Sequence, residues 1–274
     1  MSDSSCNLLL FAAGLGTRLK PYTLSNPKPV LPLFGKAMGL YIFPYLESLN
    51  IKNKVANTFH LPEQIHHLYQ NFGFTFSNET DFIKGSGGGL LQAQNHLSLN
   101  VTEPYSVLTC NADEIFFTPD RHFLSKAFSY HNQNSNFATL IVMKHPEAGH
   151  KFGAIWTEKN RVISIGKEKP TAQSEPWHFI GLQFLNHSIF SHLEPAKEQN
   201  IFYDVLVKHL DDKKIEIFPI ECDWYETGNL EDYKIAKTEI SKILSDKKHL
   251  KHKIYEDHFN ALQKYPHSQL SDLA

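Results

Sequence analysis

Two positively charged side chains lie in a short N-terminal segment whose composition suits binding of an anion. Residues 14–36 read GLGTRLKPYTLSNPKPVLPLFGK and directly follow the apolar run 8–13. A buried strand that ends in glycines leaves backbone N–H groups free to meet an anion, and Arg18 and Lys28 add two full charges. Prolines on both sides restrict the backbone of Lys28, which a freely moving surface lysine would not require. From residue types alone, a polyphosphate site and a proline-stiffened surface loop fit this segment about equally well.

Two familiar nucleotide-binding motifs are excluded for this segment. A dinucleotide fingerprint requires G-x-G-x-x-G, and Leu19 stands where the third glycine would be. A P-loop requires G-x-x-x-x-G-K followed by Ser or Thr, and the sequence contains no such string. If the segment binds a nucleotide, the mode of binding is therefore a different one.

The elements that position this segment alternate between strands and helices, which predicts an α/β fold with a mixed sheet between helices. Predicted strands cover residues 8–13, 55–59, 74–76, 105–110, 137–143, 152–157, 162–166, 179–185 and 215–220, and predicted helices cover residues 40–49 with a kink or start at Pro44, 62–71, 201–209 and 230–244. A second glycine run at 85–89 is predicted to be a loop that feeds a helix. Ligands of open α/β sheets bind outside the carboxyl ends of the strands, so both glycine loops and Asp113 should converge there.

Composition limits the classes of function and the domain organisation. The 274 residues are 41% hydrophobic and 20% charged, which predicts one main domain over 1–244. Four lysines within 247–253 and a weak helix at 255–263 predict an appended helical tail over 245–274. Lys+Arg 27 against Asp+Glu 29 gives 27 − 29 = −2, so no global positive field would hold nucleic acid or an anionic membrane.

Cysteine usage and apolar runs predict the compartment. Three widely spaced cysteines and no recognisable leader predict a reduced cytoplasmic protein. No apolar run reaches the roughly 18 residues that span a bilayer. Sixteen histidines show no ligand spacing, even at His60, His66 and His67, so we expect surface or packing residues and no zinc site.

The N-terminal segment resembles the signature of the sugar-1-phosphate nucleotidylyltransferases. That pattern reads roughly G-x-G-T-R-x-x-P-x-T, then P-K-P-[LV]-x-P-x-x-G-[KQ], and twelve positions between Gly14 and Lys36 fall in register. The resemblance implies a Rossmann-like, GT-A-type three-layer sandwich around a central mixed, mostly parallel sheet. It also implies transfer of a nucleotidyl group from a nucleoside triphosphate to a sugar 1-phosphate, with release of pyrophosphate. We expect a monomer or small homo-oligomer, between which the sequence does not decide.

The resemblance assigns catalytic and metal-binding roles. Arg18 would clamp the leaving pyrophosphate with its planar guanidinium, and Lys28 would neutralise the α-phosphate. Asn111-x-Asp113 resembles the strand end at which the family holds Mg²⁺, although an Asp in this position is otherwise more often a turn residue. Residues 223–233 resemble W-x-D-x-G-[TN], with Glu226 in place of the usual Asp as the second metal ligand. A small hard cation needs only one or two carboxylates besides phosphate and water.

Further residues are assigned to the two substrates by the same resemblance. Nucleotide binding falls to the backbone at Leu10, Ala12, Ala13, Gly14, Gly16 and Thr17, and to Gly87 and Gly88, where the main chain would approach the base closely. Sugar-phosphate binding falls to Asn111, Gly153, Glu168, Lys169 and Gly181, with Glu168 accepting hydrogen bonds from sugar hydroxyls. Without the resemblance, the Glu168-Lys169 pair is more typical of a solvated strand end.

The branch of the family is predicted from short strings only. Asn57-x-x-x-Leu61-x-x-Gln64-Ile65 resembles a stretch of the N-acetylmuramate 1-phosphate uridylyltransferases of cell-wall recycling. This favours uridylyl transfer to a hexosamine or muramate 1-phosphate. Mannose-1-phosphate guanylyltransferases and choline-phosphate cytidylyltransferases share parts of the motifs and are alternatives. A regulatory subunit that binds nucleotide sugar and has weak catalysis is an alternative of another class, because Ala112 and Glu226 depart from the pattern.

Overall fold

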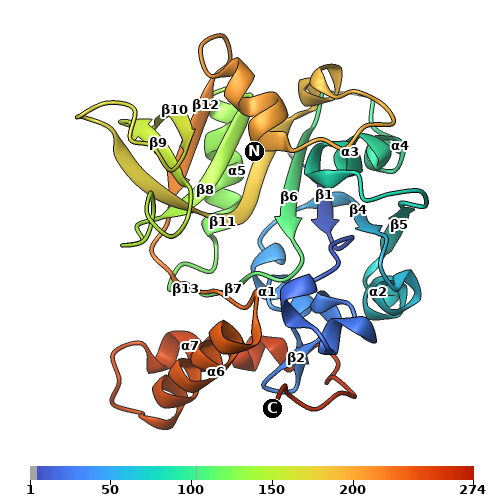
Figure 1. The fold of residues 1–274 in the computed structure, drawn as a ribbon, viewed down its shortest axis with the longest axis vertical. Helices are drawn as coiled ribbons and strands as arrows, with labels where there is room; N and C mark the ends of the chain where they lie inside the picture. The colour runs from blue at the N-terminus through green and yellow to red at the C-terminus, as the bar shows by residue number, and fades with distance from the viewer. Residues whose placement is uncertain (1–4, 103) are drawn as a thin grey trace.

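A nine-stranded mixed sheet with helices on both faces forms the centre of the protein (Figure 1). The computed structural model describes residues 5–102 and 104–274. The order across the sheet is β5 (Phe74–Asn78), β4 (Ile51–Thr58), β1 (Cys6–Phe11), β6 (Ser106–Asn111), β11 (Glu175–Asn186), β8 (Ala138–Met143), β12 (Ile215–Pro219), β10 (Arg161–Gly166) and β9 (Ala154–Glu158). The α/β class and the mixed sheet are confirmed.

Parallel pairing of β5, β4, β1 and β6 brings their carboxyl ends to one edge of the sheet (Figure 1). Leu9 of β1 pairs with Val55 on one side and Thr109 on the other. Strand β11 runs antiparallel to both of its neighbours, β6 and β8. The sheet therefore has four parallel and five antiparallel pairings, so the expected predominance of parallel pairs is wrong.

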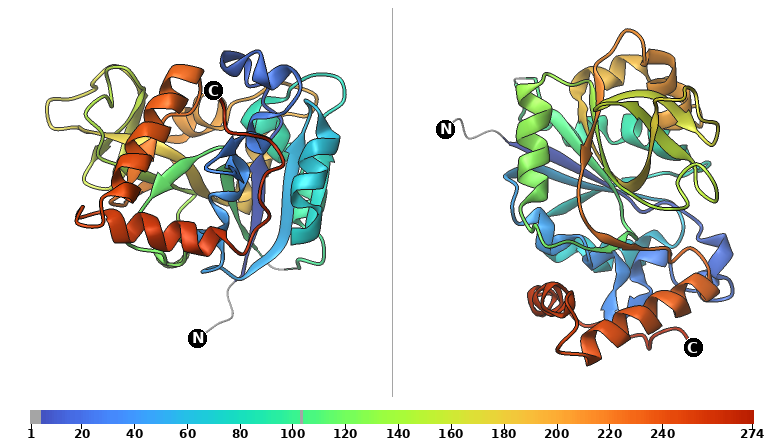
Figure 2. Two further views of the ribbon diagram at one scale, coloured as in Figure 1. Left: turned by 90° about the horizontal axis from the view of Figure 1, so that it is seen from below. Right: turned by 90° about the vertical axis from the view of Figure 1, so that its left-hand side faces the viewer.

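The sheet buries apolar side chains on both faces. Along β1, Leu8 and Leu10 point into one core and Leu9 into the other, which explains why this strand is a continuous apolar run. The first core is covered by α5 (Phe123–Gln133), α1 (Phe43–Leu46) and α2 (Pro62–Tyr69), and the second by α3 (Gly85–Gln92), α4 (Gln94–Leu97) and residues 187–209. Figure 2 shows α5 and α3 on opposite sides of the sheet.

Two predicted helices differ in form from the expectation. Residues 40–49 do not form one helix: a 3₁₀ turn at Met38–Leu40 precedes the single turn α1, which has Pro44 in its first turn. Residues 201–209 form a π-helix at Ile201–Leu206 followed by a 3₁₀ turn at Val207–His209. Helix α5 was not predicted, although its buried residues (Phe123, Leu124, Ala127, Phe128 and His131) recur at helical spacing.

Two short ribbons outside the main sheet were also not predicted. Strands β2 (Pro32–Leu33) and β3 (Lys36–Ala37) form a hairpin, and β7 (Ile115–Phe117) pairs with β13 (Asp223–Tyr225). Strands of two or three residues are too short to show a period of two. Their pairing partners lie far apart in the sequence for β7 and β13, so only tertiary structure reveals them.

The C-terminal tail packs into the same core as the main sheet. Helix α6 (Leu230–Ser245) is followed by α7 (His252–Leu262), which buries Tyr255 and Leu262 in the first core together with Leu273 near the chain end. The division into 1–244 and 245–274 stays a prediction. No helix within residues 5–102 and 104–274 has the length and apolar character to cross a bilayer.

His258 of α7 is buried among aromatic rings. Its ring centroid lies 5.0 Å from that of Tyr45 and 5.1 Å from that of Phe117, and the residue is 2% exposed. Neither ring nitrogen has a hydrogen-bond partner among the described residues. Burial lowers the pKa of His258 to about 3, so the imidazole is neutral in the folded protein. This histidine has the packing role that the sequence predicted for the histidines in general.

We predict that His258 makes the protein less stable in mild acid. The unfolded chain, with an imidazole pKa of about 6.5, takes up a proton that the folded chain excludes down to about pH 3, so stability falls as pH falls below 6.5. Between pH 7.5 and 5.5 the loss from this residue should be about 1.4 kcal/mol. Urea unfolding of wild type and His258→Phe at both pH values measures the difference.

The control for this prediction is His67→Phe, which changes an exposed histidine of α2. This variant should keep the wild-type change in unfolding free energy between the two pH values. An equal change in His258→Phe and wild type would contradict the assigned pKa.

Candidate active site

A short ion pair joins the two charged residues that the sequence singled out at the sheet edge. Lys28 Nζ lies 2.6 Å from Asp113 Oδ2. Lys28 begins the 3₁₀ turn Lys28–Val30, and its side chain is only 13% exposed. Asp113 lies two residues beyond the end of β6, and the intervening Ala112 donates its N–H to the carbonyl of Phe11 at the end of β1. The parallel strands β1 and β6 therefore place the lysine loop and the aspartate side by side, as the sequence predicted.

Arg18 and Glu226 form the second charge pair of the site. Arg18 lies in a 3₁₀ turn (Thr17–Leu19), its side chain is 68% exposed, and its Nη2 is 3.9 Å from Glu226 Oε1. The same carboxylate oxygen accepts a 2.7 Å hydrogen bond from the N–H of Gly228. A Cβ atom at Gly228 would lie 2.3 Å from this oxygen and 2.5 Å from Arg18 Nη2, so any larger residue there would displace one of the two side chains.

The β7–β13 ribbon brings Glu226 to the same place as Asp113. Tyr225 pairs with Ile115, the first residue of β7, so Glu226 follows the last pair just where Asp113 and Glu114 precede it. Two residues separated by more than a hundred positions are thereby held at one end of a single ribbon. All four predicted charged residues of the site, Arg18, Lys28, Asp113 and Glu226, are connected by these contacts.

The carboxylates keep oxygen atoms that a small cation would use. Among the described residues, Asp113 Oδ1 and Glu226 Oε2 accept no hydrogen bond, whereas the other oxygen of each group contacts a cation or a backbone N–H. The described part of the chain contains no group of three or more His, Cys, Asp or Glu residues arranged to hold a metal ion. Two carboxylates fit Mg²⁺, which completes its coordination with phosphate oxygens and water.

Glu114 is a half-buried acid beside this pair that the sequence did not single out. Its carboxylate accepts hydrogen bonds from Asn111 Nδ2 and Trp224 Nε1, both at 2.8 Å. Burial raises the pKa of Glu114 to about 7, and the neighbouring Asp113 carboxylate adds to the rise. Gly181 of β11 has φ +81°, and a Cβ atom there would lie within 2.5 Å of the Glu114 carboxyl group.

Two predicted sugar-site residues, Asn111 and Gly181, lie against the Glu114 carboxyl group. Asn111 and Gly181 both surround this carboxyl group, Asn111 by a hydrogen bond and Gly181 by the space that its missing side chain leaves. Trp224 completes the same cluster from β13. The two predicted residues are thus tied to the Asp113 end of the site, and their contact with a sugar stays a prediction.

A second buried network supports the end of β1. Asn57 at the end of β4 accepts a 2.8 Å hydrogen bond from the N–H of Ala12 and donates one of 2.8 Å to Glu79. Glu79 also accepts from the N–H of Lys84, just before α3. Burial raises the pKa of Glu79, and the residue is 4% exposed. Asn57 thus fixes the predicted nucleotide loop relative to α3, a role that its sequence context did not reveal.

The second glycine run is the first turn of α3 rather than a loop, so that expectation is wrong. Gly87 and Gly88 are buried against residues 193–199: a Cβ atom at Gly88 would lie 2.7 Å from the carbonyl oxygen of Lys197, and one at Gly87 would lie 3.0 Å from Leu193 and Gln199. Close packing of this neighbouring segment accounts for both glycines. Their contact with a nucleobase stays a prediction.

The remaining nucleotide-site residues follow β1 in a turn. Leu10, Ala12 and Ala13 are buried, Gly14 and Thr17 are exposed, and a Cβ atom at Gly14 would have open space around it. Gly16 has φ +58°, and its carbonyl accepts a hydrogen bond from Thr23 Oγ1 at 2.9 Å. This left-handed turn re-aims the chain so that Arg18 lies over Glu226.

The other predicted sugar-site residues lie on loops at the ends of β9 and β10. Glu168 and Lys169 are exposed after β10 and make no ion pair or hydrogen bond with another residue of the described chain. Gly153 precedes β9, and a Cβ atom there would be 4.0 Å from Gly166 at the end of β10. The structure brings Gly153 close to the start of this loop, but among the described residues no hydrogen bond or ion pair joins Glu168 or Lys169 to Lys28 or Asp113.

Comparison with known proteins places this site in a family context. The family model for nucleotidyl transferases matches residues 7–243, which include all four charged residues of the site. A probable mannose-1-phosphate guanylyltransferase of Oryza sativa is 28% identical over 232 residues, covering 82% of this chain and 62% of the relative. A UTP–glucose-1-phosphate uridylyltransferase of Synechocystis is 25% identical, covering 82% of this chain and 61% of the relative. The chain thus spans about three fifths of these curated relatives.

The fold is likewise shared with solved structures. A UDP-glucose pyrophosphorylase determined with UDP-glucose superposes with a TM-score of 0.70 at 21% identity, covering 87% of this chain and 99% of that one. At this identity the likeness concerns the fold alone. Because the family model extends from β1 through α6, the chain belongs to the nucleotidyl transferase family.

Proposed function

We propose that this protein is a sugar-1-phosphate nucleotidylyltransferase of EC 2.7.7 type. It would join a nucleoside triphosphate and a sugar 1-phosphate into a nucleotide-diphospho-sugar and release pyrophosphate. The observation that carries the proposal is the gathering of Arg18, Lys28, Asp113 and Glu226 at the carboxyl ends of β1 and β6. The family membership of the chain supports the same reaction class.

The main obstacles to this reaction are repulsion between two anions and their alignment. Lys28, held by its buried neighbours, would neutralise charge that develops on the α-phosphate as the sugar phosphate attacks. Arg18, which is exposed and loosely paired, would turn from Glu226 to grip the leaving pyrophosphate with two N–H groups. No nucleophilic side chain is needed, since the substrate oxygen itself attacks.

Arg18 and Lys28 are each paired with a carboxylate in the structure. This pairing suggests how the site accommodates the negative charge of its substrates. Asp113 and Glu226 would hold Mg²⁺, which when bound supplies positive charge to the phosphates. Lys28 and Arg18 would then exchange their carboxylate partners for phosphate oxygens. The Lys28 charge is thus held in place by its short pair with Asp113, whereas the exposed Arg18 is free to move toward a phosphate.

The substrates are proposed at two levels of detail. A hexose 1-phosphate is the broader proposal, since the similar proteins named above act on mannose or glucose 1-phosphate. The finer proposal is uridylyl transfer to an N-acetylhexosamine or muramate 1-phosphate, from the short strings around Asn57. Guanylyl transfer to mannose 1-phosphate is the second candidate, favoured by the relative from Oryza sativa. Choline phosphate stays a third, from the shared first motif.

The experiment that tests the proposed function is a substrate panel. Purified protein with Mg²⁺ is mixed with each of four nucleoside triphosphates and with hexose, hexosamine or muramate 1-phosphate or phosphocholine, and pyrophosphate is measured. Release with one triphosphate and one sugar phosphate is the expected result. Binding of a nucleotide sugar by calorimetry with no release from any mixture would favour the regulatory-subunit alternative.

We predict that Lys28→Ala and Asp113→Asn each lower kcat for pyrophosphate release by about a hundredfold to a thousandfold. The reason is loss of one fixed charge at the reacting phosphorus, a kind of loss that costs this much in other enzymes. Initial rates at saturating substrates measure the effect. Lys248→Ala and Asp211→Asn make the same charge changes on exposed residues elsewhere and should stay within about twofold of wild type.

We predict that Glu226→Gln raises the Mg²⁺ concentration for half-maximal rate by about tenfold or more, because it removes the charge of a proposed ligand. A magnesium titration of the rate measures this, and Glu231→Gln, an exposed change in the first turn of α6, is the control. An unchanged magnesium requirement in Glu226→Gln would show that Glu226 only orients Arg18.

A further inference from the structure

The hairpin that follows Lys28 contains a strained two-residue turn. Strands β2 and β3 are joined by Phe34 and Gly35, which have φ values of +49° and +70°. Two left-handed residues in succession fit a tight hairpin, but a left-handed phenylalanine is unfavourable by itself. Such a conformation persists only where surrounding groups hold it in place.

The C-terminal strap, residues 264–273, supplies groups that hold this turn. Asp272 accepts hydrogen bonds from the N–H groups of both Phe34 and Gly35, at 3.0 and 3.1 Å. The carbonyl of Gly35 accepts a 2.8 Å hydrogen bond from the N–H of Ser268. Lys237 of α6 lies 3.2 Å from Asp272 and balances its charge. The end of the chain lies beside β2 in Figure 1.

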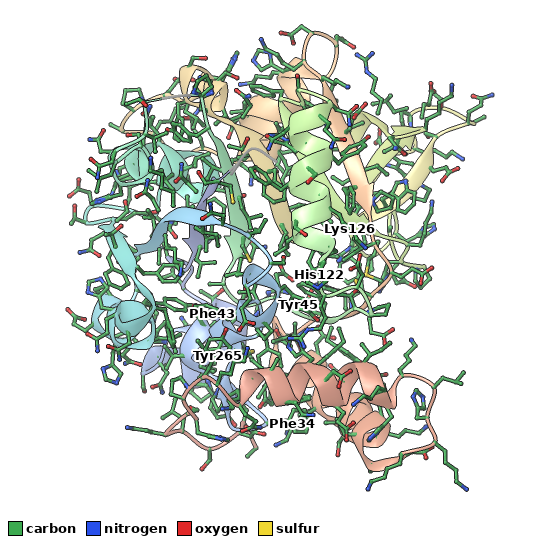
Figure 3. The ribbon with its side chains drawn as sticks, turned by 180° about the vertical axis from the view of Figure 1, so that it is seen from behind. Phe34, Phe43, Tyr45, His122, Lys126 and Tyr265 are labelled. Atoms are coloured by element: carbon green, nitrogen blue, oxygen red, sulfur yellow. The ribbon has the colours of Figure 1, made fainter. Side chains whose placement is uncertain are left out.

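The two sides of the hairpin are tied to the tail as well. Lys36 is 1% exposed, and its ammonium group donates a 2.5 Å hydrogen bond to the carbonyl of Tyr265 in the strap. On the other strand, the carbonyl of Pro32 accepts from Tyr233 Oη at 2.8 Å, and the same hydroxyl accepts from the N–H of Leu273. Figure 3 labels Phe34 on the hairpin and Tyr265 on the strap. The Phe34 ring packs edge-on against Phe259 of α7, with ring centroids 5.5 Å apart.

A continuous set of hydrogen bonds leads from this turn back to Lys28. The N–H of Met38, after β3, donates to the carbonyl of Leu31 at 2.9 Å and closes the base of the hairpin. The N–H of Leu31 in turn donates to the carbonyl of Lys28 at 3.0 Å. The hairpin therefore connects the backbone of Lys28 at its base to the turn at its tip, where Asp272 accepts hydrogen bonds from the two N–H groups.

We propose that Asp272 is a positioning residue for the reaction: through the β2–β3 hairpin, it holds the backbone of Lys28 where the ammonium group meets Asp113. This inference rests on the proposed function, since it gives the C-terminal strap a part in the same site. Asp272 thus supports a hairpin that lies more than two hundred residues earlier in the sequence. Other tail acids lack this geometry: Asp257 of α7 pairs only with Lys253 among the described residues.

The test is a double-mutant cycle between the strap and the lysine. Asp272→Asn keeps the shape of the side chain but removes its charge and replaces one acceptor oxygen by an NH₂ group that faces a backbone N–H. We expect kcat for pyrophosphate release to fall about tenfold, with KM for the triphosphate changed less than about twofold, because only the alignment of the charge is lost. In the Lys28→Ala background the same change should have no further effect on kcat.

A second readout does not depend on turnover. Hydrogen exchange of the peptide covering residues 27–37 should be faster in Asp272→Asn than in wild type, whereas Asp257→Asn, which removes the same charge elsewhere in the tail, should leave exchange and kcat as in wild type. Midpoints of thermal unfolding for both variants separate this local effect from a general loss of stability.

The outcomes distinguish the positioning role from the function itself. Absence of pyrophosphate release by the wild type over the whole substrate panel would overturn the proposed function. With an active wild type, an unchanged kcat in Asp272→Asn would overturn the positioning role. An equal fold-loss in the Lys28 and Lys28→Ala backgrounds would overturn it too, since the strap would then act on stability alone.

Discussion

The short ion pair between Lys28 and Asp113 is the interaction that the structure around the site must hold in place. It requires that a loop after β1 and a loop after β6 meet, which the parallel pairing of these two strands provides. It also requires that neither loop moves freely, because a mobile ammonium group would not stay aligned with a reacting phosphate. The surrounding structure meets the second requirement from three directions: Asn57 below the end of β1, Glu114 and Trp224 beside Asp113, and the β2–β3 hairpin behind Lys28.

The buried and half-buried polar groups near the site follow from this need for order. Asn57, Glu79 and Glu114 are costly to remove from water, and each is compensated by hydrogen bonds to backbone or side-chain donors. None of them needs to touch a substrate to matter, because each fixes a loop that carries a predicted contact. The glycines at 88 and 181 belong to the same pattern, since a side chain at either would collide with the packing around the site, and a side chain at Gly87 would be tightly crowded.

The C-terminal tail is part of this arrangement rather than an independent appendage. Helix α7 buries His258 and Tyr255 against the aromatic residues of the first core, and the strap beyond it reaches the hairpin after Lys28. The lysine-rich sequence of the tail did not predict its contact with the hairpin, because the groups that make this contact are mainly one aspartate and a few backbone N–H and C=O groups. Their partners can be identified only when distant segments are placed in space.

The sequence by itself determined the α/β class, most strands, the family and the four charged residues, because local patterns carry each of these: apolar runs of strand length, a glycine turn with Arg18, and prolines around Lys28. It did not determine that Gly85 begins a helix, that β11 reverses direction, or that Glu114, Asn57 and Asp272 support the site. Tertiary structure decided these points, since they depend on which backbone donors, acceptors and surfaces meet across large sequence separations. Hydrogen bonds and close packing depend on which groups are near one another in space, whereas a single sequence gives only their separation along the chain.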